Sequence, residues 1–201
     1  MADKTRPYNK KARALAEEAT GQAILDAALQ AFSSELFDRV TLRQIATASS
    51  VTVQTVIRRF GTKEELFEHL AEREGKRIIA EREVPVQMGL RAALDALVAH
   101  YERDGDMMLN FIHQEHLSEP VRKVVSRGRQ VHREWVETHC RDLLSGRSGK
   151  DREHILLAAI AATDLYTWKL LRRDHGLDPE SVTAVMNRIL WSLDGTSRPN
   201  G

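Results

Sequence analysis

The sequence predicts an all-α protein with a small N-terminal domain and a larger C-terminal one. Apolar residues recur at helical spacing in almost every segment, and no strand-like alternation persists. The periodic segments before residue 80 are short and closely spaced, and those after it are longer. A chain of 201 residues is long enough for one small and one larger domain. We expect roughly nine helices. The expected organisation is a basic arm at 1–17, a three-helix unit continued by a fourth helix at 18–78, and a larger helical domain at 79–195.

The composition excludes several classes of protein. With 42% hydrophobic and 29% charged residues, the chain has the make-up of a globular protein. The single cysteine, Cys140, excludes an internal disulfide framework. No apolar run approaches the ~18 residues of a membrane span, and the start of the chain lacks the apolar region of a signal peptide. We therefore expect a cytoplasmic protein without a membrane segment.

The arm at 1–17 has an excess of positive charge, carried by Lys4, Arg6, Lys10, Lys11 and Arg13. Such a run is either a solvated tail or a basic arm beside a polyanion, and the sequence leaves both interpretations open. The first predicted helix follows, with one apolar face formed by Ile24, Leu25, Ala28, Leu29 and Phe32. Thr20 is a possible N-cap for it. Residues 10–19 also favour a helix, so the sequence leaves its starting point open.

Two capping boxes mark the starts of the next helices. In this motif a Ser or Thr hydroxyl accepts from the third helical N–H, and the side chain there reaches back. Thr41 with Gln44 has this pattern, and Thr62 with Glu65 has it again. A short helix from about Thr52 to Phe60 is expected between them, because Val56 and Phe60 have an i, i+4 spacing.

The larger domain is also predicted to be helical. An apolar stripe from Leu90 to Tyr101 is expected to end at Gly105, and a short helix is expected at about Met107–His113. Pro120 suits the first turn of a long helix. Residues 155–162 are apolar on all sides, so the helix expected at 152–173 must be covered on more than one face.

The last predicted helix spans residues 179–193. Asp178 and Pro179 form an N-cap and first-residue pair, and Gly195 is the expected stop. Together with 152–173 it supplies more apolar surface than one small domain covers, which favours a four-helix bundle between two copies of the chain. The predicted dimer interface consists of Leu165, Trp168, Met186, Ile189, Leu190 and Leu193.

Residues 41–60 have the pattern of a helix-turn-helix, whose second helix enters the DNA major groove. Ala46 is the small residue where the helices meet, and Val51 and Val56 supply apolar contacts. This arrangement leaves the first residues of the second helix facing solvent. Gln pairs with adenine, Val and Thr methyls contact thymine, and arginines and a helix N-terminus bind phosphate. The predicted DNA-contacting residues are Thr41, Leu42, Thr52, Val53, Gln54, Thr55, Arg58, Arg59 and Lys63.

This stretch resembles the tetracycline-repressor (TetR) family of bacterial regulators. The shared pattern covers about residues 18–78 and appears here as Ala28 to Phe32, Thr41 to Ala46, the turn at 49–52, Phe60, and Lys63, Glu64 and Leu66. The resemblance implies a homodimer whose larger domain binds a small molecule and thereby controls affinity for a DNA operator. The function it implies is a regulator, a repressor released from a palindromic operator by a hydrophobic or amphipathic effector.

Three positions depart from the family pattern. Leu36 stands where the family usually has a turn glycine, and Ser50 replaces the glycine between the two helices of the motif. Ser50 must then adopt a backbone conformation that is easy for glycine. Ile57 stands where the family commonly has a phosphate-contacting tyrosine, so a hydroxyl donor is lost. Two alternatives therefore stay open: an all-helical ligand-binding protein with degenerate DNA binding, and a stand-alone structural DNA-binding protein.

An effector pocket is expected in the larger domain, since ligand pockets are mostly apolar with a few directed polar groups. The residues proposed to line it are Tyr101, Met108, Phe111, His113, Trp135, His139, Tyr166 and Trp168, although ordinary core is an equally good interpretation of each one. The spacing of His113 and His116 matches no common zinc motif, and His139 and Cys140 point about 100° apart on a helix. We expect no metal, no cofactor and no enzymatic activity.

Overall fold

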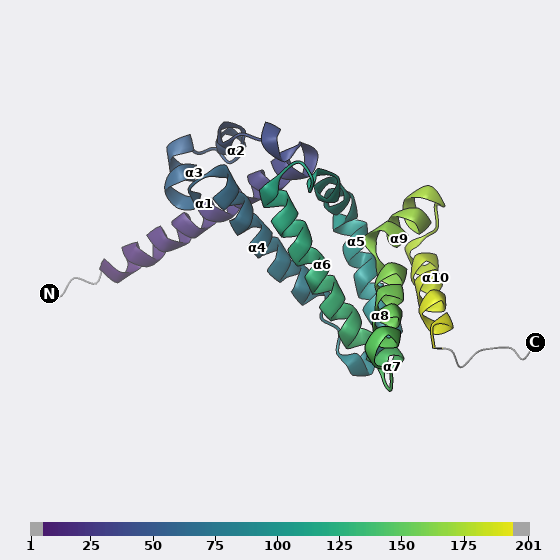
Figure 1. Cartoon of the computed structure of the whole chain (residues 1–201). Coiled ribbons are helices and arrows are strands. Elements are labelled where there is room, and N and C mark those ends of the chain that lie inside the picture. The colour runs from purple at the N-terminus through teal and green to yellow at the C-terminus, as the bar shows by residue number, and fades with distance from the viewer. Residues whose placement is uncertain (1–5, 195–201) are drawn as a thin grey trace, which may run out of the picture. The chain divides into compact units, whose positions relative to one another are not determined.

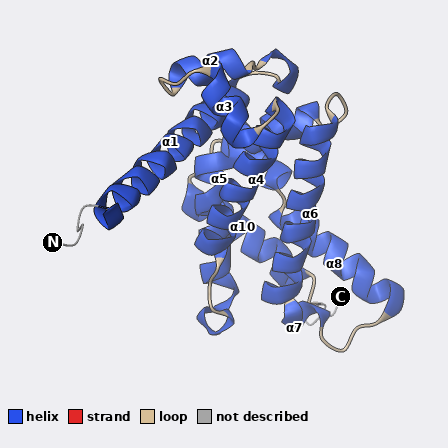
Figure 2. Cartoon of the chain, turned by 90° about the vertical axis from the view of Figure 1, so that its left-hand side faces the viewer, coloured by secondary structure: helices blue, strands red, loops and turns tan. Residues whose placement is uncertain are grey.

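The structure is a computed structural model that describes residues 6–194, with side chains from residue 11 onward (Figure 1). All regular secondary structure in this range is helical, and Figure 2 shows no strand within it. The predicted all-α fold is confirmed. The elements are α1 (Arg6–Ser34), η1 (Phe37–Arg39), α2 (Leu42–Ala48), α3 (Val53–Phe60), α4 (Lys63–Arg82), η2 (Val86–Met88), α5 (Gly89–Gln114), α6 (Glu119–His139), α7 (Arg141–Leu144), α8 (Gly149–Thr163), α9 (Leu165–Lys169), η3 (Leu170–Asp174) and α10 (Pro179–Ser192).

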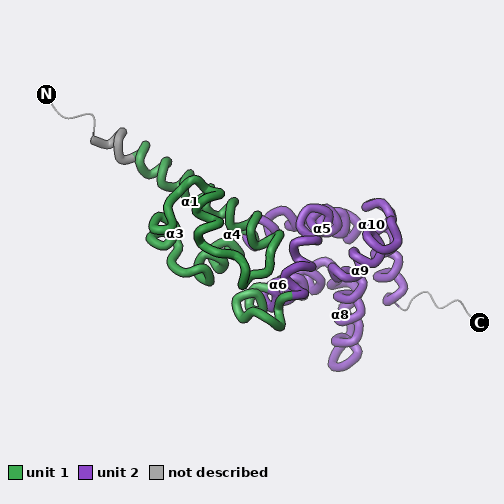
Figure 3. Tube along the Cα trace, turned by 90° about the horizontal axis from the view of Figure 1, so that it is seen from above, with its two compact units in different colours: residues 1–74, 114–124 green, residues 75–113, 125–201 purple. Residues whose placement is uncertain are grey.

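These helices form two compact units (Figure 3). Among the described residues, unit 1 comprises 6–74 and 114–124, and unit 2 comprises 75–113 and 125–194. The division after Glu74 falls inside α4, so one continuous helix contributes residues to both units.

Unit 1 is held together by an aromatic core. Phe32 on α1 stacks on Phe37 at 5.4 Å between ring centroids, and Phe67 on α4 packs edge-on against both rings at 4.9 and 5.1 Å. Aromatic pairs in such geometries contribute about 0.5–1.5 kcal/mol each beyond their buried area. Ile24 and Ala28 are fully buried on the same face of α1 as Phe32, which confirms the predicted apolar face.

The predicted capping boxes are confirmed. The Thr41 hydroxyl accepts from the Gln44 N–H at 3.2 Å, and the Gln44 side chain accepts from the Thr41 N–H at 2.8 Å. Thr62 and Glu65 make the same pair of hydrogen bonds, at 3.2 and 2.7 Å. These bonds fix where α2 and α4 begin, and thereby set the length of the chain between them.

The prediction of Thr20 as an N-cap is wrong. Helix α1 is continuous from Arg6, and the Thr20 hydroxyl donates to the Ala16 carbonyl inside it. Residues 11–19 contain strong helix formers and neither Gly nor Pro, so nothing interrupts the helix there. Of the predicted basic arm, Lys4 lies outside the described residues, and Lys11 and Arg13 are exposed on α1.

Two predicted boundaries in unit 2 are also wrong. Gly105 does not end a helix, because α5 runs through it to Gln114. A Cβ atom added to Gly105 would lie 2.6 Å from two ring carbons of Trp168, so this glycine makes room for a neighbouring side chain. The helix expected at 152–173 is broken at Asp164, whose backbone is extended and whose carboxylate accepts from the Tyr166 N–H at 2.8 Å.

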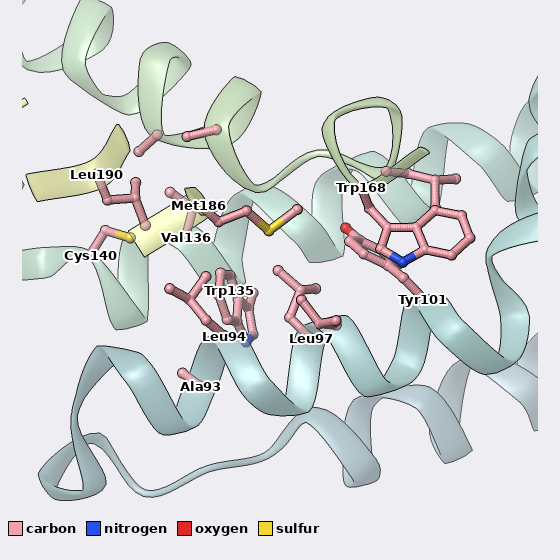
Figure 4. Close-up of a cluster of buried hydrophobic side chains, with 14 of the residues drawn as sticks. Ala93, Leu94, Leu97, Tyr101, Trp135, Val136, Cys140, Trp168, Met186 and Leu190 are labelled. Atoms are coloured by element: carbon pink, nitrogen blue, oxygen red, sulfur yellow. The ribbon is translucent and has the colours of Figure 1, made fainter. Parts of the chain in front are cut away.

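The core of unit 2 is drawn from α5, α6, α8, α9 and α10 (Figure 4). Leu94, Leu97, Leu156, Trp168 and Met186 are each fully buried within it. The Cys140 thiol belongs to this core, and burial raises its pKa to about 12, so it is a thiol and not a thiolate at neutral pH. Asp178 caps α10 by accepting from the Ser181 N–H, as predicted.

Candidate functional site

Helices α2 and α3 meet through a tight turn at residues 49–52. The Val51 N–H donates to the Ala46 carbonyl at 2.9 Å, and the Ser50 N–H donates to the Thr47 carbonyl at 3.2 Å. This pair of bonds is the Schellman arrangement that closes a helix, with the residue after the C-cap in the left-handed region. Ser50 occupies that position with φ of 56°. A serine therefore adopts the left-handed conformation predicted for this position, where the family usually has glycine.

Leu36, the other replaced glycine, has an extended backbone with φ of −65°. The turn after α1 is made instead by η1, which Leu36 precedes. No left-handed residue is needed there, and this departure from the family pattern introduces no strain.

The start of α3 is fixed by Thr52. Its hydroxyl accepts from the Thr55 N–H at 3.2 Å, and the two threonine hydroxyls lie 3.0 Å apart. The hydroxyl groups of both threonines are therefore partly occupied by hydrogen bonds within the helix. Gln54 is exposed and Val53 is half-buried, while Val56 is fully buried under the helix. This placement leaves Gln54 as the polar side chain at the beginning of α3 with no bond to the protein among the described residues.

The three predicted phosphate-binding cations differ in their surroundings. Arg58 is exposed and has no acidic partner among residues 11–194. Arg59 lies against α1, since a Cβ added to Gly21 would be 2.5 Å from its Nε, and it also lies 5.9 Å from the Phe60 ring. Lys63 donates to the Phe37 carbonyl at 2.9 Å and sits 4.5 Å from the Phe37 ring. Its ammonium group has three protons, so a phosphate contact remains compatible with this bond.

Arg39 on η1 and Arg43 on α2 are two further cations that were not among the predicted DNA contacts. Both are exposed, and neither has an ion-pair partner in the described part of the chain. Arg43 lies on α2, the first helix of the helix-turn-helix, and Arg39 lies on η1, the element that precedes it. Leu42 is half-buried, and Ile57 is 44% exposed on α3. An apolar side chain this exposed on the second helix is the clearest departure from a polar DNA-facing surface.

The residues proposed for the effector pocket do not form one cluster. Tyr101, Trp135 and Trp168 belong to the core of unit 2, and the half-buried His139 ring lies 4.9 Å from Trp135. The Tyr101 hydroxyl donates to the Thr163 carbonyl, and the Trp168 indole donates to Glu102 at 2.7 Å. Two members, His113 and Tyr166, are exposed, whereas Met108 and Phe111 are half-buried.

The predicted dimer interface separates into buried and accessible residues. Leu165, Trp168, Met186 and Leu190 are buried in the core of a single chain, so they are not available to a second copy. Ile189 is 37% exposed, and Leu193 is half-buried. Other large apolar side chains are exposed on α8 to α10, namely Leu157, Tyr166, Leu170 and Trp191.

No group of three His, Cys, Asp or Glu side chains between residues 11 and 194 is arranged to hold a metal ion. None of the helices in the described range has the length and apolar character that a membrane crossing needs.

A short helix, a Schellman turn and a second helix with exposed polar residues define a helix-turn-helix protein of the DNA-binding class. Residues 24–70 match the family described as bacterial regulatory proteins of the tetR family. Residues 24–70 therefore form a DNA-binding domain of the tetR-family type, as the resemblance over about residues 18–78 predicted. No curated protein sequence matches the chain.

The fold is shared by solved structures of low sequence identity. A TetR-like transcriptional regulator from Rhodococcus sp. RHA1 is 20% identical with a TM-score of 0.67, over 88% of this chain and 97% of that one. A tetR-family regulator from Streptomyces coelicolor is 19% identical with a TM-score of 0.68, over 88% and 82%. The regulator FadR from Bacillus subtilis, solved with stearoyl-CoA, is 15% identical with a TM-score of 0.60, over 88% and 99%.

Proposed function

We propose that this protein is a ligand-responsive transcriptional repressor of the TetR family that binds a palindromic DNA operator as a homodimer. The observation that carries the proposal is the surface of α3. Gln54 and Arg58 are exposed on it and lack partners among the described residues, while Val56 on the opposite face of the helix is fully buried. Gln54 is the proposed base-reading residue, and Arg58, Arg59 and Lys63 are the proposed phosphate contacts.

The dimer is supported by the apolar surface of α8 to α10. Leu157, Tyr166, Leu170, Ile189 and Trp191 are 37–64% exposed there, and monomeric proteins rarely expose a large apolar patch without a partner. Helices α8 and α10 contact each other within unit 2, so they can present a common face to a second copy. Two-fold symmetry also doubles the number of base pairs read, because each subunit contacts one half-site.

Release by an effector is supported by the division of the chain. Helix α4 contributes residues 63–74 to unit 1, which contains the helix-turn-helix, and 75–82 to unit 2. A ligand that binds unit 2 more tightly in a conformation unsuited to DNA lowers DNA affinity by that difference, typically about 1–3 kcal/mol. Bacillus subtilis FadR, which shares the fold, was solved with stearoyl-CoA, and this favours a hydrophobic or amphipathic effector.

The test is selection of bound sequences from a random DNA library with the full-length protein. The molecular mass of the complex with the most enriched duplex is then measured. The proposal predicts enrichment of an inverted repeat and two protomers per duplex. No enrichment at low salt would favour the alternative of a ligand-binding protein with degenerate DNA binding. The observation behind this alternative is the exposed Ile57 on α3. One protomer on a single half-site would contradict the dimer.

A further inference from the structure

Arg82, the last residue of α4, is a buried cation without a counter-charge. It is 6% exposed, and no Asp or Glu in the described part of the chain lies within ion-pair distance of it. Its Nη2 lies 3.3 Å from His132 Nδ1, and its guanidinium lies 5.2 Å from the centroid of the Trp135 ring. Its Nε is buried and has no hydrogen-bond partner. Buried charges in proteins are normally paired, because an isolated one is strongly unfavourable.

The groups around Arg82 do not supply the missing negative charge. Burial, followed by the charge of Arg82, lowers the pKa of His132 to about 3, so the imidazole is neutral. Its Nδ1 accepts from Arg82, and its Nε2 donates to the Thr163 hydroxyl at 3.1 Å. That hydroxyl donates in turn to the Ala159 carbonyl at 2.8 Å. The chain of bonds fixes the guanidinium in place and ends on a neutral backbone group.

Asp104, the buried aspartate of unit 2, is already paired. The Asp104 carboxylate accepts from Arg77, Arg103 and His100, at 3.1, 2.9 and 3.0 Å. His100 therefore uses its Nδ1 proton on Asp104, and its unpartnered Nε2 is an acceptor that offers nothing to an anion. Asp104 consequently belongs to a separate ion-pair network.

A second donor beside Arg82 also has no partner. The Nε1 of Trp135 is buried and makes no hydrogen bond, although buried tryptophan N–H groups usually do. The guanidinium of Arg82 lies 5.2 Å from the centroid of this same ring, so the two donors without a partner belong to neighbouring side chains, one of them cationic. The indole also forms part of the apolar cluster of unit 2, together with Leu94 and Leu97 (Figure 4).

We propose that Arg82 and Trp135 form a buried anion-binding site that takes the carboxylate of an amphipathic monocarboxylic acid, whose apolar part packs into the core of unit 2. A guanidinium presents its N–H groups in the geometry that a carboxylate accepts. One positive charge is neutralised by one negative charge, whereas a dianionic phosphate would leave a buried excess. The connection after Arg82 reaches the surface at once, since Glu83 and Pro85 are exposed. This inference deepens the proposed function and rests on unit 2 being the effector-binding unit.

The experiment is calorimetric titration of the full-length protein with decanoate, decanamide and decyl phosphate. Decanamide has nearly the shape of decanoate without its charge, and decyl phosphate carries the other common anion. The matched variants are Arg82→Met, which removes the buried charge, and Arg91→Met, which removes an exposed arginine paired with Asp95. We expect decanoate to bind the wild type and Arg91→Met equally. It should bind Arg82→Met on the order of 30-fold more weakly, because this variant lacks the buried positive charge that pairs with the carboxylate. Decanamide and decyl phosphate should bind the wild type more weakly than decanoate does.

Thermal melting separates this role from a purely structural one. Removing an unpaired buried charge stabilises a ligand-free site, so Arg82→Met should melt above the wild type without ligand. Decanoate binding that is unchanged in Arg82→Met, or decanamide binding as tightly as decanoate, would overturn the proposal. If Arg82→Met does not fold, Trp135→Phe replaces it, because it removes the N–H and keeps the ring; unchanged decanoate binding there also overturns the site.

A DNA titration with and without decanoate distinguishes this inference from the proposed function. Decanoate that binds through Arg82 and leaves DNA affinity unchanged supports the site and contradicts its regulatory use. If the protein binds no DNA, the proposed function is wrong. The calorimetry then still decides whether Arg82 binds a carboxylate.

Discussion

Replacing Gly105 with alanine tests how closely α5 and α9 pack in unit 2. The new Cβ would lie 2.6 Å from Cη2 and Cζ3 of Trp168 and 3.2 Å from its Cε3. Trp168 is fully buried, its indole N–H donates to Glu102, and the Arg173 guanidinium lies 4.7 Å from its ring. The ring therefore has nowhere to move without losing these contacts. Overpacking of this kind costs about 1–3 kcal/mol, and the better helix propensity of alanine offsets about 1 kcal/mol. We expect a net loss of up to about 2 kcal/mol.

The assay is urea unfolding of the full-length protein, with Gly128→Ala as the matched control. Gly128 is exposed in the middle of α6, and an added Cβ there would meet nothing within 4 Å. The control should gain up to about 1 kcal/mol from helix propensity alone. Because both variants gain the same helix propensity, their unfolding free energies should differ by the overpacking cost, about 1–3 kcal/mol. Equal stabilities for Gly105→Ala and Gly128→Ala would refute the close contact with Trp168.

Three further changes have expected outcomes. Ser50→Gly should raise the unfolding free energy by about 0.5–1 kcal/mol, because relief of the left-handed serine outweighs the extra chain entropy that glycine gives the unfolded state; a decrease would contradict the turn geometry. Ile57→Tyr should tighten DNA binding about fivefold by adding a hydroxyl donor on an exposed position, and weaker binding would place Ile57 against a base or a partner surface. Lowering the pH from 7 to 5 should reduce the unfolding free energy by about 2 kcal/mol through His132, whose folded pKa of about 3 lies below its unfolded value, so that only the unfolded state gains a proton. The same pH change should have a smaller effect on His132→Gln, and an equal effect in both proteins would show that His132 is not buried and neutral.

The features that the sequence predicted correctly depend on neighbouring residues. Thr41 with Gln44, Thr62 with Glu65, and Asp178 with Ser181 are each within three positions of their partner, so their spacing alone determines the bond. The left-handed backbone at Ser50 was predicted from the family resemblance, because the family usually has glycine at this position.

The incorrect predictions depend on partners distant in sequence. Gly105 has the appearance of a helix stop, and only the position of Trp168, on a different helix, explains why α5 continues through it. Apolar spacing likewise gave no means of separating Met186 and Leu190, which are core, from Ile189 and Trp191, which are accessible. Arg82 shows the same limit, since an arginine at a helix end is normally solvated and nothing nearby in the sequence indicates its burial.

DNA recognition by α3 is measured most directly by a salt titration of fluorescence anisotropy. The protein is titrated onto a duplex taken from beside its own gene and onto a random duplex of equal length, with Arg58→Ala and Gln54→Ala in parallel. We predict salt-sensitive binding that favours the gene-flanking duplex. Arg58→Ala should weaken binding to both duplexes and reduce the salt slope by roughly 1. Gln54→Ala should reduce only the preference, by about 1–3 kcal/mol at one base pair. Absence of binding at low salt, or an equal loss on both duplexes in Gln54→Ala, would contradict base reading by this helix.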